Sequence, residues 1–399
     1  MTVAQNYQLL NNALAQVLGQ GQIQVVDVSS LADAGKLLAN FKNGYELFNK
    51  AILDVMIRTE IDMELFEIEG IPFLSKTSRF GGFIREIYVG QPEAEENTSW
   101  DIGDEHYTPS LPGVQKLPVT VKCYTNRGTH RFKWTIPDMQ ADSAFHSNEE
   151  LDAYITGIGV AVENAVRTDI VEISRLVRCK YIGDVATTAD TESLVNVLTL
   201  YKTDFPDDTD IDEDNCWTNK AFLKYLCEVL ARYPKRLAQV GSHYINEKTA
   251  DSDDYIRQTT SKHLVTELLS DVANKIRFNL EADTFHPDKL GFGKYNEVEF
   301  WQGRGDDSLE DFSTINVTVD PGDATATPQI PATTFNQNGV IGVMYDDRAI
   351  IQIYDMPYSF AWHNDWDRYT THGVDANYGF AYKKSYPCVI FIVADEDTP

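Results

Sequence analysis

The longest regular pattern of apolar residues in the chain predicts one long helix near its middle. From residue 147 onward, apolar side chains recur at steps of three and four, which places them on one helical face. The run Ser147-Asn148-Glu149-Glu150 forms a capping box at the start, and Gly183 is the predicted stop. We therefore expect one face of this helix to pack against a core. The predicted stripe consists of Leu151, Tyr154, Ile155, Ile158, Val162, Val166, Ile170, Ile173, Leu176 and Val177.

Two glycines, Gly157 and Gly159, interrupt the apolar face of this predicted helix. Each costs about 1 kcal/mol relative to alanine in a helix interior. One interpretation is close packing against a neighbouring element, because glycine removes bulk. The other is a bend point that lets the helix adopt two curvatures. Both interpretations remain open at this stage.

A long two-stranded excursion precedes the helix. Residues 83–89 and 117–124 are rich in β-branched and aromatic residues, which is typical of strands. More than twenty residues separate them, with several prolines, glycines and acidic residues but no apolar periodicity. A connection of this length is uncommon inside a compact domain and is usually functional or disordered. Because a lone hairpin is marginally stable, we expect another surface to hold it.

Strand patterns dominate the end of the chain. Residues 340–345 and 349–354 flank a turn signal at Asp346-Asp347, and residues 389–393 are continuously apolar, as in an interior strand. Alternating large side chains indicate further strands at Phe360, Trp362, Tyr378, Phe380 and Tyr382. The predicted fold class is therefore α+β, with a lobe that combines the mid-chain helix and the C-terminal strands.

The other regions give weaker patterns. Short amphipathic helices are predicted within residues 1–78, and most of their stability would come from packing onto something else. Residues 184–349 are mixed, with a helix capped by Thr218 and ended by Pro234, and a strand expected at residues 297–301. Residues 264–276 fit either a strand or a helix.

Composition restricts the possible functions. The net charge of −27 disfavours sequence-specific DNA binding, and no Lys or Arg precedes Lys36. The longest apolar run, residues 388–394, is far shorter than the roughly 20 residues of a membrane-spanning helix, so we expect no membrane partner. Five scattered cysteines without a CxxC pair indicate reduced thiols in a cytoplasmic setting.

The densest group of potential metal ligands follows Trp362. His363, Asp365 and Asp367 would share one side of a strand, while His372 lies beyond the next turn. These residues allow a metal-dependent hydrolase as an alternative function, although no HExxH or other catalytic motif is present. A solvated or hydrogen-bonded strand face is the simpler interpretation.

The order of these elements resembles the major capsid proteins of tailed phages, with the Hong Kong 97-type fold. Residues 83–90, 124–137, 343–354 and 378–382 resemble in particular the capsid proteins of small short-tailed podoviruses of the phi twenty-nine kind. The resemblance implies an N-arm at residues 1–78, an E-loop at 79–137 and an axial domain at 184–349. It implies a peripheral domain made of residues 138–183 and 350–399, with the long helix as its spine.

The resemblance also implies a function. The chain would be a structural protein, not an enzyme, that needs no cofactor and self-assembles into pentamers and hexamers of an icosahedral or prolate head. That head would enclose double-stranded DNA without sequence-specific binding, with a scaffolding protein and a portal as further partners. The protein would be assembled in the host cytoplasm and located in the virion. A cellular cargo shell of the encapsulin type, which shares the fold, is a second alternative.

Three groups of residues are the expected sites under this resemblance. The spine-helix bend would lie at Gly157 and Gly159, and the peripheral-domain sheet would carry Phe360, Trp362, Tyr378, Phe380 and Tyr382. The expected inter-subunit contacts of the E-loop are Phe83, Ile84, Arg85, Glu86, Ile87, Tyr88, Trp100 and Tyr107. No catalytic or metal-binding residue is expected.

Overall fold

The structure is a computed structural model. It describes residues 11, 74–77, 84–92, 116–124, 128–137, 148–188, 192–208, 210–247, 254–281, 294–302, 312–319 and 333–395. The predicted N-terminal helices lie almost entirely outside the described residues, as does the connection between the two strands of the excursion. The chain divides into two compact units. Unit 1 comprises Met1–Phe80, Asn126–Val177 and Ile351–Ala381, and unit 2 comprises Gly81–Thr125, Arg178–Ile350 and Tyr382–Pro399.

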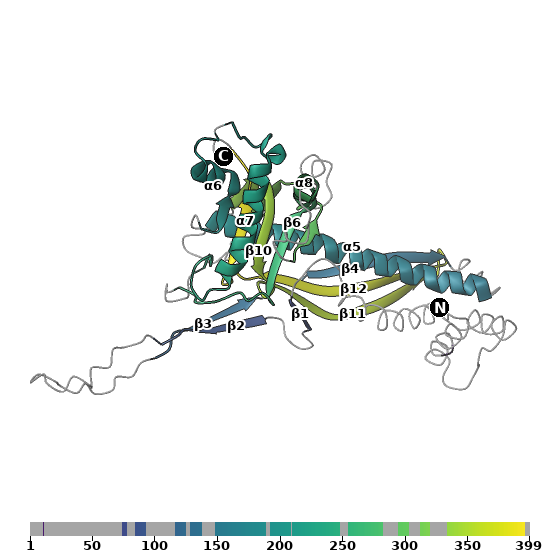
Figure 1. The fold of residues 1–399 in the computed structure, drawn as a ribbon. Helices are drawn as coiled ribbons and strands as arrows, with labels where there is room; N and C mark the ends of the chain where they lie inside the picture. Colours follow the sequence, from purple (N-terminus) through teal and green to yellow (C-terminus); the bar gives the residue numbers. More distant parts are fainter. Residues whose placement is uncertain are drawn as a thin grey trace, which may run out of the picture. The chain divides into compact units, whose positions relative to one another are not determined.

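Unit 1 is built on a four-stranded sheet in the order β1-β11-β12-β4. Its strands are β1 (Leu74–Thr77), β4 (Gly128–Pro137), β11 (Ile350–Asn364) and β12 (Tyr369–Tyr382). β1 pairs with β11 in parallel, and β12 pairs with β4 antiparallel. The long helix α5 (Asn148–Thr188) lies along this sheet over its unit 1 residues (Figure 1). Two strands from before the helix thus complete a sheet that the sequence placed only at the C-terminus.

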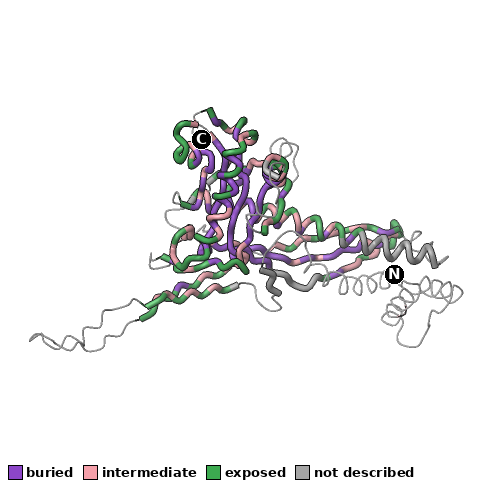
Figure 2. The backbone as a smooth tube through the Cα atoms, in the orientation of Figure 1, coloured by how far each residue is buried: buried purple, intermediate pink, exposed green. Residues whose placement is uncertain are grey.

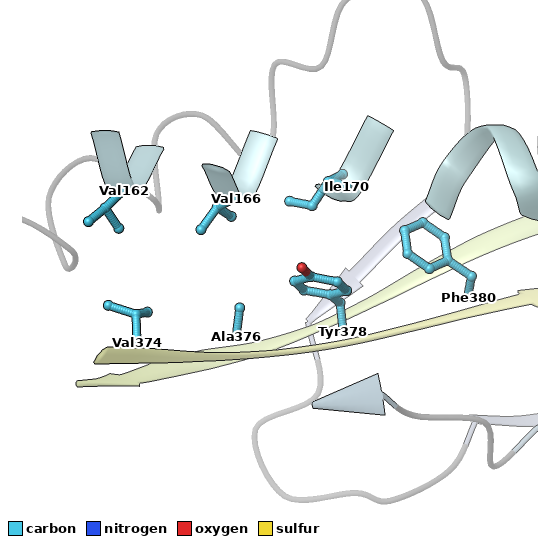
Figure 3. Packing of buried hydrophobic residues seen from close by; sticks show 7 residues of the cluster. All are labelled: Val162, Val166, Ile170, Val374, Ala376, Tyr378 and Phe380. Carbon is cyan, nitrogen blue, oxygen red and sulfur yellow. The ribbon is translucent and has the colours of Figure 1, made fainter. Parts of the chain in front are cut away.

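The core of unit 1 forms where α5 meets β12. Alternate residues of β12 point to the same face, so Val374, Ala376, Tyr378 and Phe380 all face the helix. On the helix, the residues that pack against β12 are four positions apart. Figure 3 shows their side chains opposite those of β12. These helical residues are Val162, Val166 and Ile170. The expected packing of the mid-chain helix on C-terminal strands is therefore confirmed.

The helix departs from prediction at its C-terminal end. It continues through Gly183 to Thr188, so the predicted stop at this glycine is wrong. A Cβ at Gly183 would lie 2.6 Å from Cγ2 of Val317 and 3.3 Å from Cβ of Phe335, so glycine serves close packing here instead of ending the helix. Leu176, assigned to the apolar stripe, is 47% exposed.

Unit 2 contains a five-stranded sheet in the order β5-β13-β10-β6-β7. Its strands are β5 (Leu194–Asn196), β6 (Leu264–Leu269), β7 (Asn296–Val298), β10 (Val340–Asp346) and β13 (Cys388–Ile392). The unit also contains α6 (Val197–Asp204), the short 3-10 helix η2 (Cys216–Thr218), α7 (Lys220–Leu237) and α8 (Ser270–Glu281). Two hairpins complete it: β2 (Ile84–Val89) with β3 (Val119–Tyr124), and β8 (Ile315–Val319) with β9 (Thr333–Gln337).

The continuously apolar segment near the C-terminus is an interior strand, as predicted. β13 is buried throughout and lies between β5 and β10. However, β10 and β11 belong to different sheets, so the turn signal at Asp346-Asp347 does not join a hairpin. Residues 382–399 group with unit 2, whereas all of residues 350–399 were expected to join the spine helix. Within the sheet, β5 and β10 flank the two edges of β13, and on one face the Phe391 ring of β13 lies 5.1 Å from the ring of Tyr233 in α7.

Three local expectations in unit 2 also need correction. The side chain of Asn219, and not that of Thr218, caps α7, because it accepts hydrogen bonds from the backbone N–H groups of Ala221 and Phe222. Pro234 lies inside α7 and does not end it, because the helix continues to Leu237. Residues 264–276 contain both predicted alternatives, since β6 leads directly into α8. The strand expected at residues 297–301 is shorter, ending at Val298.

Candidate assembly surface

The β2–β3 hairpin has one exposed apolar face. Ile87 lies opposite Val121, and Val89 lies opposite Val119, so these four side chains share one side of the ribbon. Ile87 is 60% exposed and Val121 is 52% exposed, and the other two are similarly open. Figure 2 shows the alternation of exposed residues along both strands. We call Ile87, Val89, Val119 and Val121 the apolar outer face.

The opposite face of the hairpin is attached to other segments of unit 2. The ring of Tyr88 lies 4.6 Å from that of Tyr255, and the backbone N–H of Ile256 donates a hydrogen bond to the Tyr88 hydroxyl at 3.1 Å. Lys122 forms an ion pair with Glu247. The expected surface that holds the base of the excursion is therefore supplied, at least for this face, by its own chain.

Glu86 is the most enclosed charged residue of this inner face. Its Oε2 accepts a hydrogen bond from the Tyr124 hydroxyl at 2.9 Å, and its Oε1 accepts one from Nη2 of Arg257 at 3.0 Å. Burial raises the pKa of Tyr124, and the neighbouring Glu86 carboxylate raises it further. The Tyr124 hydroxyl consequently stays protonated and acts as a donor to the carboxylate.

The hairpin residues expected to contact other subunits divide between the two faces. Arg85 and Ile87 are exposed, whereas Glu86 and Tyr88 point toward unit 2. Ile84 opens β2, and the remaining three expected residues, Phe83, Trp100 and Tyr107, lie outside the described residues. Val89, Val119 and Val121 were not among the expected contacts, although the strict alternation along both strands is the signal that identifies them.

The expected sheet residues lie in different environments. Tyr378 and Phe380 are buried in the core of unit 1, where the Tyr378 hydroxyl donates a hydrogen bond to Asp169. The Phe360 ring packs in the space left by Gly373, and Arg131 lies 4.9 Å from its centroid. Trp362 is 61% exposed. Tyr382 belongs to unit 2, with its ring 5.7 Å from that of Tyr181.

Both glycines expected at the helix bend lie within the continuous α-helical stretch of α5. The segment runs as α-helix from Asn148 to Thr188 without a 3-10 or π turn. The glycines thus occupy the element to which the sequence assigned them.

The suggested metal ligands are not assembled into a site. Nε2 of His363 lies 3.3 Å from Oδ1 of Asp365, but Nδ1 of His363 lies 3.0 Å from the Thr370 hydroxyl, and Asp367 accepts a hydrogen bond from Asn364. Burial lowers the pKa of His372 to about 4, so this side chain is neutral at physiological pH. Within the described part of the chain, no group of three His, Cys, Asp or Glu side chains could hold a metal ion.

The described helices include none that is both long and apolar enough to cross a membrane.

Comparison with known proteins gives a consistent result. The family model of Phi29-like phage major capsid proteins matches residues 10–392. Among curated proteins, none matches this sequence. The fold is similar to that in the capsid structure of Staphylococcus phage Andhra, with 11% identity, a TM-score of 0.52 and coverage of 82% of this chain and 84% of that chain.

A second solved structure supports the same fold. A chain in the structure of the head fiber and inner core protein gp22 of native bacteriophage P68 has 12% identity and a TM-score of 0.50. The match covers 82% of this chain and 86% of that chain. The comparisons thus confirm the predicted α+β capsid fold, and they support neither the metal-dependent hydrolase nor the encapsulin alternative.

The family match covers nearly the whole chain, and a ribbon with an exposed apolar face suits a protein that meets other subunits. The chain belongs to the Phi29-like phage major capsid protein family, and it is a structural component of the virion and not an enzyme.

Proposed function

We propose that this protein is the repeating subunit of pentamers and hexamers in a phage head, and that the β2–β3 hairpin contacts neighbouring copies. The apolar outer face carries the proposal. Its four side chains are half or more exposed, while the inner face of the same ribbon is fixed to unit 2. A ribbon anchored on one face presents the other face in a defined direction. In a shell, every subunit has adjacent copies that this apolar outer face can contact.

The energy of such a contact comes mainly from burying apolar surface. Removing this surface from water contributes about 25 cal/mol per Å². Contacts between different surface patches of identical subunits close into rings when the rotation permits. A subunit held by several neighbours must lose all of its contacts together, so modest individual contacts can stabilise a shell.

The remaining features of the proposal rest on the same family membership. A scaffolding protein and a portal would take part in assembly, and the head would enclose double-stranded DNA. The net charge of −27 supports enclosure without sequence-specific binding, because most of the surface repels phosphate. In the proposed domain scheme, unit 1 forms the peripheral domain on the spine helix. Unit 2 forms the axial domain together with the base of the E-loop.

Replacing Ile87 and Val121 together by serine should prevent or strongly weaken shell assembly. The two residues lie opposite each other and form one of the two cross-strand pairs of the apolar outer face, so the double variant Ile87→Ser/Val121→Ser removes half of its apolar side chains. Burial of each such side chain is worth up to about 1.5–3 kcal/mol, and the loss recurs at every subunit contact. Negative-stain electron microscopy and sedimentation of the purified protein would measure the yield of shells.

Val240→Ser provides a matched control, because Val240 is also exposed in unit 2 but lies outside the hairpin. This variant should assemble as the parent does. Both proteins should give the same circular dichroism spectrum, since neither change touches a buried residue. Normal shells from the double serine variant would contradict the proposed contact.

We also propose that Gly157 and Gly159 let the spine helix change curvature when the shell expands. The support is their position inside a helix of 41 residues, where each glycine lowers helical rigidity. The double variant Gly157→Ala/Gly159→Ala should fold normally, and it should slow or block the expansion of assembled precursor shells. Particle diameter against time after the expansion trigger is the measurement. Expansion at the parental rate would contradict this role.

A further inference from the structure

Glu86 lies in a socket formed by donors from three separate segments. Tyr124 belongs to β3, Arg257 follows the segment that contacts Tyr88, and Lys383 and Ser385 belong to the turn that precedes β13. The Ser385 hydroxyl and Lys383 Nζ each lie 3.3 Å from Oε1 of Glu86. Only 8% of the Glu86 side chain is exposed. A carboxylate suits this socket because it accepts hydrogen bonds at both oxygens and from several donors at once.

The socket brings cations together around the ring of Tyr386. The guanidinium of Arg257 lies 4.0 Å from the ring centroid, and Lys383 Nζ lies 5.5 Å from it. Arg348 lies 5.1 Å from the same centroid, but it donates two hydrogen bonds to its own carboxylate partner, Asp346. Arg257 and Lys383 instead share the carboxylate of Glu86, so one negative charge lies beside two largely buried positive charges.

The other anchors of the hairpin reach a different part of unit 2. Tyr88 and Lys122 contact residues 247, 255 and 256, on either side of a stretch outside the described residues. Glu86 reaches the turn at residues 383–386, where the backbone N–H of Lys383 donates to the carbonyl of Ala349 at 2.8 Å. That turn leads directly into β13, an interior strand of the five-stranded sheet. Among the described contacts of the hairpin, those of Glu86 tie the ribbon most directly to the sheet.

We infer that Glu86 is the positioning residue that sets the direction in which the hairpin presents its apolar outer face. Its contacts with Arg257, Lys383 and Ser385 hold the ribbon at one angle to the five-stranded sheet. This inference rests on the proposed function, because the angle matters for assembly only if the outer face meets another subunit. The inner face then has a separate role, for which it does not need to contact the neighbouring subunit.

The test measures the direction of the hairpin in the unassembled full-length chain. Cys123 lies on β3 and is exposed, whereas the other four cysteines are buried, so a spin label attaches selectively there. A second label at Val240→Cys, an exposed site in unit 2, gives one distance across the unit. The labelled parent should show a narrow distance distribution. Adding Glu86→Gln, which keeps the side-chain shape but removes the charge, should shift or broaden that distribution.

Hydrogen exchange provides a second readout of the same effect. Removing one member of a buried charge network leaves the remaining charges uncompensated, so exchange of the β3 amides should accelerate about tenfold or more in Glu86→Gln. The amides of β10 and β13 should keep their protection, because the change lies outside the sheet. The control is Glu228→Gln, which removes an exposed charge from α7 of the same unit, away from the hairpin and from both labels. It should leave both the distance distribution and the exchange rates unchanged.

Several outcomes would overturn the inference. An unchanged distance distribution in Glu86→Gln would do so, as would shells of normal yield and diameter from a variant whose hairpin has shifted. If Glu86→Gln does not fold, Tyr124→Phe removes a single donor to the same carboxylate and should give a smaller shift in the same distance. An unshifted distance in a folded Tyr124→Phe would then count against the inference. The proposed contact between the apolar outer face and a neighbouring subunit is tested separately. It would be contradicted by normal shell assembly of Ile87→Ser/Val121→Ser.

Discussion

Replacing Glu267 by glutamine is expected to lower the free energy of unfolding by about 3–5 kcal/mol, because it leaves a buried arginine without its charged partner. Glu267 is fully buried in β6, and its Oε1 lies 3.2 Å from Nη1 of Arg178 on α5. The Tyr345 hydroxyl donates to the same oxygen at 3.2 Å. Burial alone lowers the pKa of Arg178, but the Glu267 carboxylate raises it overall, so the arginine remains charged.

Urea unfolding of the purified unassembled protein would measure this effect. The control is Glu228→Gln, which breaks the exposed i,i+4 pair with Arg232 on α7 and should cost less than about 1 kcal/mol. The double variant Arg178→Met/Glu267→Met should recover much of the loss, since a buried ion pair replaced by apolar residues is often close to neutral in stability. Equal losses for Glu267→Gln and Glu228→Gln would show that the buried pair is not needed for stability.

The second large effect is expected from Ile170→Ala in the core of unit 1. Ile170 is almost completely buried between α5 and β12, next to Val166 and Tyr378. Shortening a buried isoleucine to alanine costs about 2–5 kcal/mol, through lost apolar contact and the cavity that remains. The same urea titration should therefore show a clearly lower transition midpoint, detected through the helical circular dichroism signal.

The matched comparison is Leu176→Ala on the same helix. Leu176 is exposed, so its replacement should change stability by no more than about 0.5 kcal/mol. The two variants test whether the helix has one face committed to the sheet. A loss for Leu176→Ala as large as that for Ile170→Ala would indicate that the exposed side of this helix segment is also packed in the folded protein.

Local patterns were sufficient to predict most individual elements. The period of three to four residues identified α5, the content of β-branched and aromatic residues identified both strands of the β2–β3 hairpin, and the period of two identified the strand that carries Tyr378 and Phe380. The continuously apolar run at 389–393 identified β13 as an interior strand. These predictions succeeded because each pattern extends over many residues, and because a helix or strand with one apolar face must bury it. The ends of elements were predicted poorly from single residues such as Thr218 and Pro234, since several terminal arrangements compete at similar energy.

The candidate site was only partly predictable from the sequence, because local patterns do not show which distant residues a strand face contacts. The sequence pointed to the hairpin and to Ile87, but it assigned Glu86 and Tyr88 to the same role as their exposed neighbours. Alternation shows that two faces exist, while it does not show which of them meets the rest of the chain. Arg257 and Lys383, which settle that question, lie more than 170 and 290 residues away from Glu86 in sequence.

The sequence by itself determined the helix, the strands and the division of each into two faces, because these depend on residues within a few positions of one another. Only the tertiary structure decided that Gly183 continues a helix, that β10 and β11 enter different sheets, and that Glu86 faces inward. Each of these outcomes depends on close packing or charge pairing between distant segments. Such contacts exist only after the chain has folded, so no local pattern encodes them.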